Sequence, residues 1–223
     1  SVALISRVSW PMAKFISVAQ LKGGAGKSTV VTNLVAALSQ EFQTGLIDAD
    51  MPQGTSARWA AIRATQYPES LPIQVLSASS VNELALAAEQ LESECDVVVI
   101  DLPPRSLKYL REVLPYSDLV VMPLTASAAD VWATEQLMEA IREGKRTSKR
   151  LKARLVWNRI RASKATELFL TETAGMLRAK ELESRLGQRA AYVDALGRGL
   201  SVLEGRDAKA SAEFSIFYQE LKK

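Results

Sequence analysis

The sequence predicts an α/β fold, in which a mainly parallel, twisted sheet carries helices on both faces. From residue 14 on, short apolar runs alternate with longer segments of helical periodicity. Such alternation requires crossover connections between parallel strands. In addition, glycines or acidic residues follow or close several of the apolar runs. These positions are the strand ends at which sheets of this class bind ligands.

The apolar runs are short and rich in β-branched residues, as expected for buried strands. They cover residues 15–19, 44–48, 73–76, 97–101, 119–123 and 154–158. Helical patterns separate or follow them over residues 27–40, 54–65, 80–93, 105–114, 128–143 and 165–179. Near the end, Phe214, Phe217 and Leu221 share one helical face, which predicts a packing helix. We expect one domain over residues 12–223, after an N-terminal extension, residues 1–11, that is disordered or was added upstream.

Composition excludes several kinds of chemistry. The chain has no histidine, which removes imidazole bases, Ser-His triads and histidine-ligated metals. A single cysteine, Cys95, excludes an internal disulfide framework and a cysteine-held iron–sulfur cluster within one chain. No apolar run is long enough to span a bilayer, and no secretory pattern appears, so a cytoplasmic protein is expected. The C-terminal stretch has only Lys222 and Lys223 as local cations and carries two glutamates, so membrane binding is not expected.

The stretch QLKGGAGKST, residues 20–29, is typical of a phosphate-binding loop. Its three glycines allow consecutive backbone amides to converge on phosphate oxygens, and the helix that follows adds its positive dipole end. Lys27 can reach the β- and γ-phosphates, and the Ser28 hydroxyl can ligate Mg²⁺. A glycine-rich turn without a ligand is the alternative, and the order strand, loop, helix argues against it.

Three acidic residues at strand ends predict the rest of the site. Asp101 closes the apolar strand DVVVID, where an acid commonly orders Mg²⁺, although it could instead cap the next helix. Asp48 and Asp50 flank one residue of extended chain, so their side chains should point to opposite sides. Because no histidine is available, one of this pair is the expected orienter of an attacking water.

A second lysine stands at the mouth of the loop. The standard pattern places its first glycine at position 21, which is Leu21, and Lys22 follows it. Lys22 and Lys27 would repel each other around one triphosphate. The alternative is that Lys22 points toward the nucleotide of a second subunit, as an arginine finger does in trans.

KGGAGKST resembles the deviant phosphate-binding loop of the ParA/MinD family of P-loop ATPases, whose signature lysine acts across a nucleotide-sandwich dimer. DADMPQG (48–54) is similar to the family's D-x-D-P-Q-G motif, and VVVIDLPP (97–104) to its Mg²⁺-binding strand. NRI (158–160) resembles the segment that helps to hold the adenine. GLSVLEGRDAKASAEF (199–214) is similar to the end of a ParA-type partition protein.

The resemblance implies a homodimer formed with ATP, in which Lys22 acts on the partner's nucleotide and Asn158 touches the base. The implied nucleotide-binding loop consists of Gly23, Gly24, Ala25, Gly26, Lys27, Ser28 and Thr29.

The resemblance also implies a metal site and a residue that positions water. Ser28 would ligate Mg²⁺, Asp101 would hold it through water and Asp48 would support its hydration shell. Asp50 would position the attacking water. Met51 separates Asp50 from the proline that follows the acid directly in the family, so the division of roles between Asp48 and Asp50 stays open.

A basic segment between residues 142 and 161 predicts polyanion binding. It holds nine cations and one acid, about +8, whereas the whole chain is +3 and the remainder is therefore near −5. With the resemblance, this predicts nonspecific binding of double-stranded DNA through Lys145, Arg146, Lys149, Arg150 and Lys152. A solvated helix end and loop is the alternative.

The expected function is that of a ParA-type ATPase. An ATP-dependent homodimer would bind DNA nonspecifically on the nucleoid, and a ParB-like or other adaptor would stimulate its otherwise weak hydrolysis. This cycle would partition or position a plasmid, a chromosome region or a protein cargo. The chain lacks the helix-turn-helix extension of larger plasmid forms, so a repressor role is not expected. A MinD-like membrane-cycling regulator and an ATP-dependent metabolic transferase are the alternatives.

Overall fold

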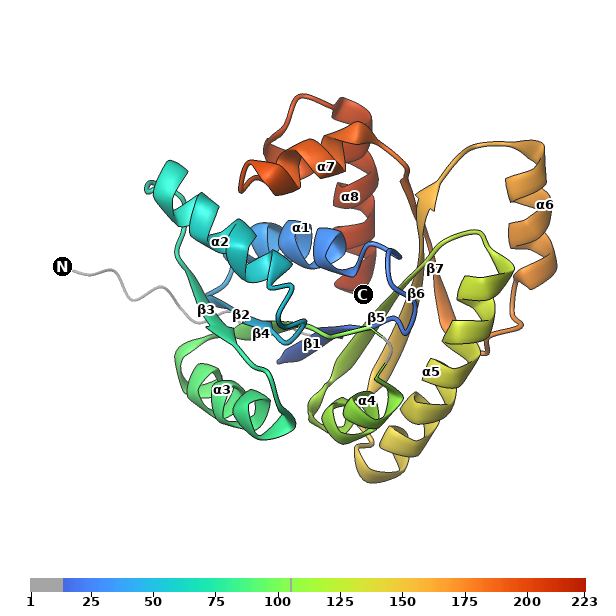
Figure 1. Ribbon diagram of the computed structural model, residues 1–223. Coiled ribbons are helices and arrows are strands. Elements are labelled where there is room, and N and C mark those ends of the chain that lie inside the picture. Colours follow the sequence, from blue (N-terminus) through green and yellow to red (C-terminus); the bar gives the residue numbers. More distant parts are fainter. Residues whose placement is uncertain (1–13, 105) are drawn as a thin grey trace.

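The computed structural model describes residues 14–104 and 106–223, in which one layer of strands is covered on both faces by helices (Figure 1). The strands of this part of the chain are β1 (Phe15–Val18), β2 (Thr44–Asp48), β3 (Ile73–Ser77), β4 (Val97–Asp101), β5 (Leu119–Leu124), β6 (Lys152–Ile160) and β7 (Lys180–Gly187). They form a seven-stranded sheet of order β3-β2-β4-β1-β5-β6-β7 with parallel pairing throughout. The predicted α/β fold class is therefore confirmed. The extension expected over residues 1–11 lies outside the described residues.

A helix connects each strand to the next. The described α-helices are α1 (Lys27–Ser39), α2 (Thr55–Gln66), α3 (Val81–Glu94), α4 (Leu107–Val113), α5 (Ala128–Thr147), α6 (Lys164–Thr173), α7 (Ala190–Gly197) and α8 (Ala208–Leu221). Two short 3₁₀ turns, η1 (Leu114–Tyr116) and η2 (Val202–Glu204), complete the connections. Within the described ranges, no helix combines the length and the apolar character that crossing a bilayer requires.

The sheet separates two hydrophobic cores because successive strand residues point to opposite faces. In β4, Val97 and Val99 face the core under α1, α2, α7 and α8, whereas Val98 and Ile100 face the core under α3, α4, α5 and α6 (Figure 1). A strand that is buried on both faces needs apolar residues at every position. This requirement explains the continuous apolar runs in the sequence.

The last helix packs as predicted. Phe214, Phe217 and Leu221 of α8 are all buried in the core that α8 shares with α1. The apolar face of α8 is thus used inside the fold.

The region after β6 differs from the prediction. The helix expected over residues 165–179 ends at Thr173, and Gly175 then takes a positive φ of 76° in a turn. The strand that follows, β7, was not predicted, because it lies at the edge of the sheet and its sequence KELESRLG alternates charged with apolar residues. Neither was α7.

Carboxylates of α8 satisfy amides along the edge strand. Glu220 accepts hydrogen bonds from the amides of Glu183 and Ser184 at 2.7 and 2.9 Å, and Glu213 accepts one from the amide of Gly187 at 3.0 Å. These bonds replace part of the ladder that a further strand would form. A strand whose outer face carries exposed charges is therefore stable at this edge.

Candidate functional site

The glycine-rich loop lies between β1 and α1, where the carboxyl ends of the central strands meet. Gly24 and Gly26 take positive φ values of 84° and 88°, a conformation that glycine adopts without steric cost. At Gly23 and Gly24, an added Cβ would meet nothing within 4 Å, so the space beside these two residues is open. The backbone of the loop is thus accessible next to the amino end of α1, as an anion site requires.

Lys27 is the buried cation of this site. It is 6% exposed at the first position of α1. Burial lowers the pKa of its ammonium group, and the carboxylates of Asp101 and Asp50 oppose that shift. The two carboxylates therefore do not fully offset the cost of burying this charge, and an anionic ligand would stabilise it further.

Asp101, at the end of β4, is a fully buried carboxylate. Neither of its oxygens accepts a hydrogen bond of normal geometry from the described part of the chain. Burial raises the pKa of Asp101 to about 7, although the nearby Ser28 hydroxyl lowers it in part. Hard cations such as Mg²⁺ prefer carboxylate and hydroxyl oxygens, so Asp101 and Ser28 fit such an ion.

The described residues contain no ready-made metal cage. No group of three or more Cys, Asp or Glu side chains within them could hold a metal ion. Mg²⁺ commonly keeps several waters and is bound together with substrate phosphates.

The two aspartates at the end of β2, Asp48 and Asp50, differ in their surroundings. The strand ends at Asp48, and the chain bends at Asp50. Asp48 is fully buried, and its two oxygens accept hydrogen bonds from the amides of Asp50 at 3.0 Å and Ala57 at 2.9 Å. It thereby ties the loop to the first turn of α2. Sequence alternation could not reveal this role, because it depends on how the loop folds back.

Asp50 is the partly exposed member of the pair. Burial raises the pKa of its carboxyl group, and Lys27 opposes the shift whereas Asp48 adds to it. The side chain of Asp50 accepts no hydrogen bond among the contacts of the described residues, so its oxygens are available to a water molecule.

Lys22 lies against α5. Its Nζ is 2.5 Å from Oδ1 of Asp130, a residue of the first turn of α5 whose side chain is 1% exposed. The other oxygen of Asp130 accepts hydrogen bonds from the amide and hydroxyl of Thr125 at 3.1 and 2.7 Å. Burial raises the pKa of Asp130, but Lys22 and Thr125 outweigh it and hold the pKa below its ordinary value.

Asp130 was missed in the sequence. The pattern Ser127-x-x-Asp130 is typical of a helix N-cap, and Ser127 does cap α5 by accepting a hydrogen bond from the amide of Asp130. Nothing in that local pattern reveals a partner that lies in the loop after β1.

The end of β6 contacts the glycine-rich loop. Asn158 donates a hydrogen bond from Nδ2 to the carbonyl of Ala25 at 2.8 Å, and Arg159 donates one from Nη1 to the carbonyl of Gly24 at 2.7 Å. A cavity of about 480 Å³ opens beside these residues and is lined further by Thr29 and by Tyr192 of α7. Arg159 was counted with the basic segment in the sequence. The structure brings it to the loop instead.

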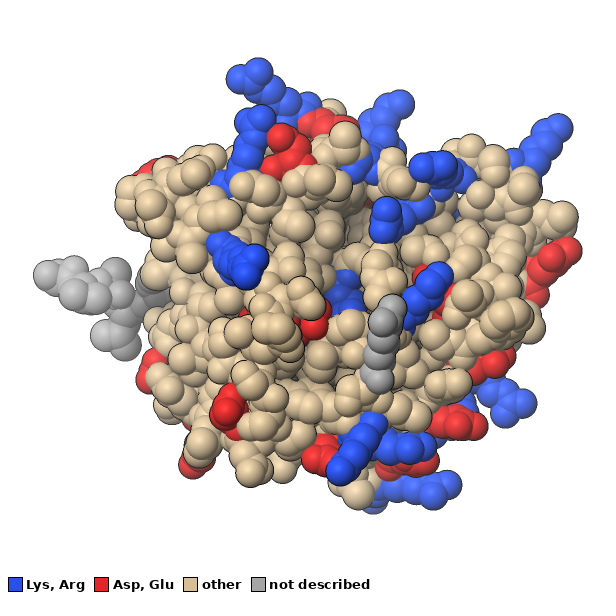
Figure 2. Space-filling view, in the orientation of Figure 1, with Lys and Arg blue, Asp and Glu red and all other residues tan. Residues whose placement is uncertain are grey.

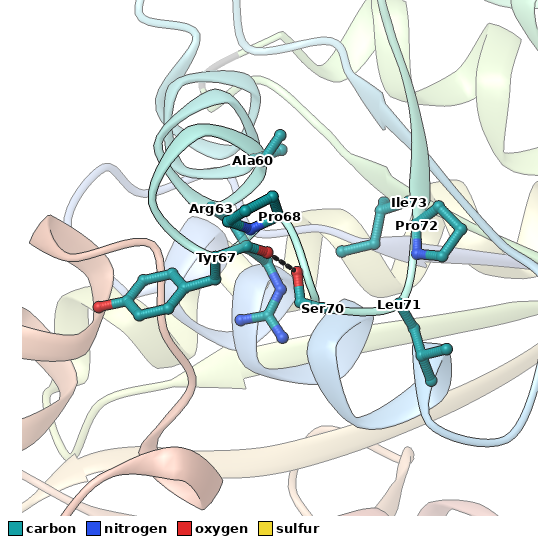
Figure 3. A pocket seen from close by; sticks show the side chains of 9 residues that line it. Ala60, Arg63, Tyr67, Pro68, Ser70, Leu71, Pro72 and Ile73 are labelled. Atoms are coloured by element: carbon teal, nitrogen blue, oxygen red, sulfur yellow. Dashed lines mark hydrogen bonds between the residues drawn. The ribbon is translucent and has the colours of Figure 1, made fainter.

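A second cavity, of about 250 Å³, lies between the end of α2 and β3 and is shown in Figure 3. Tyr67, Ser70 and Leu71 line it, and the Ser70 hydroxyl donates to the Tyr67 carbonyl at 2.7 Å. Arg63, which also lines it, is 2% exposed and binds the two carboxylate oxygens of Glu204 at 2.9 and 2.7 Å. No predicted site residue lies in this cavity.

The segment GLSVLEG, residues 199–205, contacts both α1 and α2. Glu204 holds Arg63 of α2, while Asn33 of α1 accepts hydrogen bonds from the hydroxyl of Ser201 at 2.9 Å and the amide of Val202 at 2.7 Å. The segment therefore braces both helices that follow the loop and the Asp48–Asp50 turn.

The residues of the basic segment lie at opposite ends of the parallel strands. Its exposed cations at the end of α5, in the following loop and at the start of β6 are Lys145, Arg146, Lys149, Arg150 and Lys152. β6 then runs to the glycine-rich loop, roughly 26 Å away at ~3.3 Å per residue. Figure 2 shows basic side chains at the lower edge of the view, over α4 and α5, beside some acidic ones. Arg159 and Arg161 lie at the carboxyl ends of the strands, on the side of the glycine-rich loop.

Comparisons with known proteins identify relatives of this chain. The family model described as "ATPase MipZ" matches residues 14–171. The maintenance of carboxysome distribution protein A of Halothiobacillus neapolitanus is 31% identical over 210 residues, covering 92% of this chain and 95% of that protein. Protein ParA of Rhizobium radiobacter is 29% identical over 129 residues, covering 57% of this chain and 56% of that protein.

Solved structures share the fold. The ATP complex of Cyanothece McdA has a TM-score of 0.75 at 18% identity and covers 94% of this chain and 96% of that one. The MinD cell division protein of Aquifex aeolicus has a TM-score of 0.74 at 14% identity, with the same coverage. At such identities the likeness concerns the arrangement of the backbone.

Proposed function

The chain belongs to the MipZ family of ATPases, of the ParA/MinD type, and from this premise we propose an ATP-driven positioning cycle. In this cycle two chains form a dimer around ATP and Mg²⁺, bind DNA without reading its sequence, and let go after hydrolysis. The observation that carries the proposal is the orientation of the two loop lysines. Lys27 is buried among carboxylates at the start of α1, whereas Lys22 is held by Asp130 on α5.

The loop and its surroundings support ATP binding. The amides of residues 23–29 and the ammonium of Lys27 would hold the phosphates, and Asn158 lies beside the cavity that would take the nucleoside. Ser28 and Asp101 would hold Mg²⁺, with Asp48 supporting its hydration shell. A bound Mg²⁺ would neutralise charge on the β- and γ-phosphates during phosphoryl transfer.

A two-fold dimer accounts for Lys22. Its side chain is 43% exposed at the mouth of the loop, on the edge of the sheet where the proposed phosphates would lie. When two such edges face each other, each chain can lend its Lys22 to the partner's nucleotide. The added cation would stabilise the charge that develops on the transferred phosphoryl group.

Replacing Asp50 with alanine is expected to slow ATP hydrolysis by roughly 10²–10⁴, the usual contribution of a group that orients and deprotonates water. ATP binding and the ATP dimer should persist, because Asp48 and not Asp50 holds the loop to α2. Phosphate release in the presence of DNA measures the first effect, and sedimentation with ATP measures the second. Glu89→Ala, at an exposed acid of α3, is the control. Loss of the dimer in the Asp50 variant would mean that another residue positions the attacking water.

For DNA we propose the exposed patch of Lys145, Arg146, Lys149, Arg150 and Lys152. The patch lies at the amino ends of the strands, and the glycine-rich loop lies at their carboxyl ends. A dimer whose two chains face each other through their loops would therefore carry one patch at each outer end. Two patches on one rigid dimer double the number of phosphate contacts, which steepens the salt dependence of binding. ATP would thus control DNA affinity through dimer formation.

Changing Lys145, Arg146, Lys149 and Arg150 together to glutamate should weaken DNA binding at least tenfold, and equally on unrelated sequences, because phosphate contacts carry no sequence information. Electrophoretic shifts with ATP on two duplexes of different sequence measure this. The control changes an equal number of exposed cations elsewhere: Lys164, Arg198, Arg206 and Lys209. An equal loss in both variants would mean that net charge, and not this patch, binds DNA.

The cargo we propose is a large protein assembly, served by an adaptor protein that stimulates hydrolysis. This rests on the curated relative that covers nearly the whole chain, which is named for the distribution of carboxysomes. A plasmid or a chromosome region is the alternative cargo. A MinD-like membrane cycle finds no support in α8, since its apolar face is buried.

Sedimentation with a slowly hydrolysed ATP analogue tests the whole proposal. A shift from single chains to dimers is expected, together with retention of DNA only in the dimer. Single chains at high protein and nucleotide concentration would overturn it.

A further inference from the structure

Two neighbouring carbonyl groups of the glycine-rich loop are held from outside the loop. The carbonyl of Gly24 accepts a hydrogen bond from Arg159 at 2.7 Å, and that of Ala25 accepts one from Asn158 at 2.8 Å. Both donors stand at the end of β6, more than 130 positions away in the sequence. The contact is close, because a Cβ at Gly26 would collide with the Asn158 amide nitrogen.

A held carbonyl orients the next amide. In a trans peptide group the C=O and the N–H lie in one plane and point in opposite directions. When the carbonyls of Gly24 and Ala25 point toward β6, the amides of Ala25 and Gly26 point away from β6. Neither of these two amides donates a hydrogen bond within the described part of the chain. They are therefore oriented, unpaired donors.

The backbone at Arg159 makes this double contact possible. Successive residues of a strand place their side chains on opposite faces, so residues 158 and 159 would not normally reach the same loop. Arg159 has a positive φ of 56°, one of two such non-glycine residues in the described ranges. This left-handed turn at the end of β6 brings the guanidinium to the same side as the Asn158 amide. The conformation is unfavourable for an arginine and needs a compensating contact.

We propose that Arg159, together with Asn158, is a positioning residue that sets the loop amides for phosphate before the nucleotide arrives. The inference rests on the proposed function. An oriented set of amides binds phosphate more tightly than a mobile one, because the cost of ordering the loop is met in advance. Arg159 adds an exposed, charge-assisted hydrogen bond to the buried one from Asn158.

The first test uses the nucleotide-free protein and the variant Arg159→Gly, which suits a positive φ and removes the guanidinium. Arg178→Gly is the matched control, because Arg178 is the other arginine with a positive φ, 50°, and lies between α6 and β7. The amide ¹⁵N resonances of Ala25 and Gly26 should shift in the Arg159 variant and stay in place in the control. Unchanged resonances would overturn the inference whether or not the protein binds ATP.

The second test measures affinity for ADP and for pyrophosphate by titration calorimetry. Arg159→Gly should weaken both about tenfold, the value of a hydrogen bond to a charged group, and Arg159→Lys should recover most of the loss. A loss for ADP with none for pyrophosphate would mean that Arg159 touches the nucleoside, and it would overturn the positioning role. Failure of the unaltered chain to bind ATP would instead refute the proposed function, and the resonance comparison would still decide this inference.

Discussion

Replacing Lys22 with alanine is expected to lower the rate of ATP hydrolysis by roughly 10³–10⁵, the contribution of a cation supplied in trans to phosphoryl transfer. The affinity of a single chain for ATP should change little. The physical reason is the place of the side chain, because its ammonium lies on Asp130 of α5 and not on its own loop. Steady-state phosphate release and ATP titration at a protein concentration below dimer formation measure the two effects. Lys164→Ala, an exposed lysine at the start of α6, is the control.

Mixing two inactive variants separates action in trans from action within one chain. In a dimer of Lys22→Ala with Asp50→Ala, the first chain keeps its Asp50 and receives Lys22 from the second, so one of the two sites is complete. Random pairing of equal amounts should then restore about a quarter of the normal activity. If Lys22 served its own chain, neither site would be complete. An inactive mixture whose chains do pair would therefore refute the trans role.

Lys27→Ala is expected to weaken ATP binding by more than about 100-fold, because a buried, charge-assisted contact to phosphate is lost and the neighbouring carboxylates remain. Lys27 is 6% exposed, and burial already lowers its pKa, so water does not compensate for the missing phosphate contact. The carboxylates of Asp101 and Asp50 would then face the phosphates without an intervening cation. Fluorescence titration with a labelled ATP measures the loss.

The control for Lys27 is Lys209→Ala, an exposed lysine at the start of α8, which should bind ATP normally. Circular dichroism establishes that the Lys27 variant is folded. A folded Lys27 variant with normal ATP affinity would refute the assignment of the loop as the phosphate site.

Much of this protein follows from its sequence alone. The central strands are buried on both faces, so they must be apolar at every position, and their runs stand out from the helical patterns between them. Local chemistry predicts the loop in the same way, since only glycine adopts the positive φ found at Gly24 and Gly26 at no steric cost. The structure brings these predicted residues to one edge of the sheet. β7 escaped prediction because an edge strand with alternating charges carries no continuous apolar run.

The tertiary structure decided which residues support the loop and the acids. Lys22 meets Asp130, and Gly24 meets Arg159, because the order β1-β5-β6 places the ends of these strands and the start of α5 side by side. Strand order depends on packing across the whole sheet, and hydrophobic periodicity contains no information about it. For the same reason, only the folded chain separates Asp48, which anchors α2, from Asp50, whose oxygens accept no hydrogen bond from the described residues.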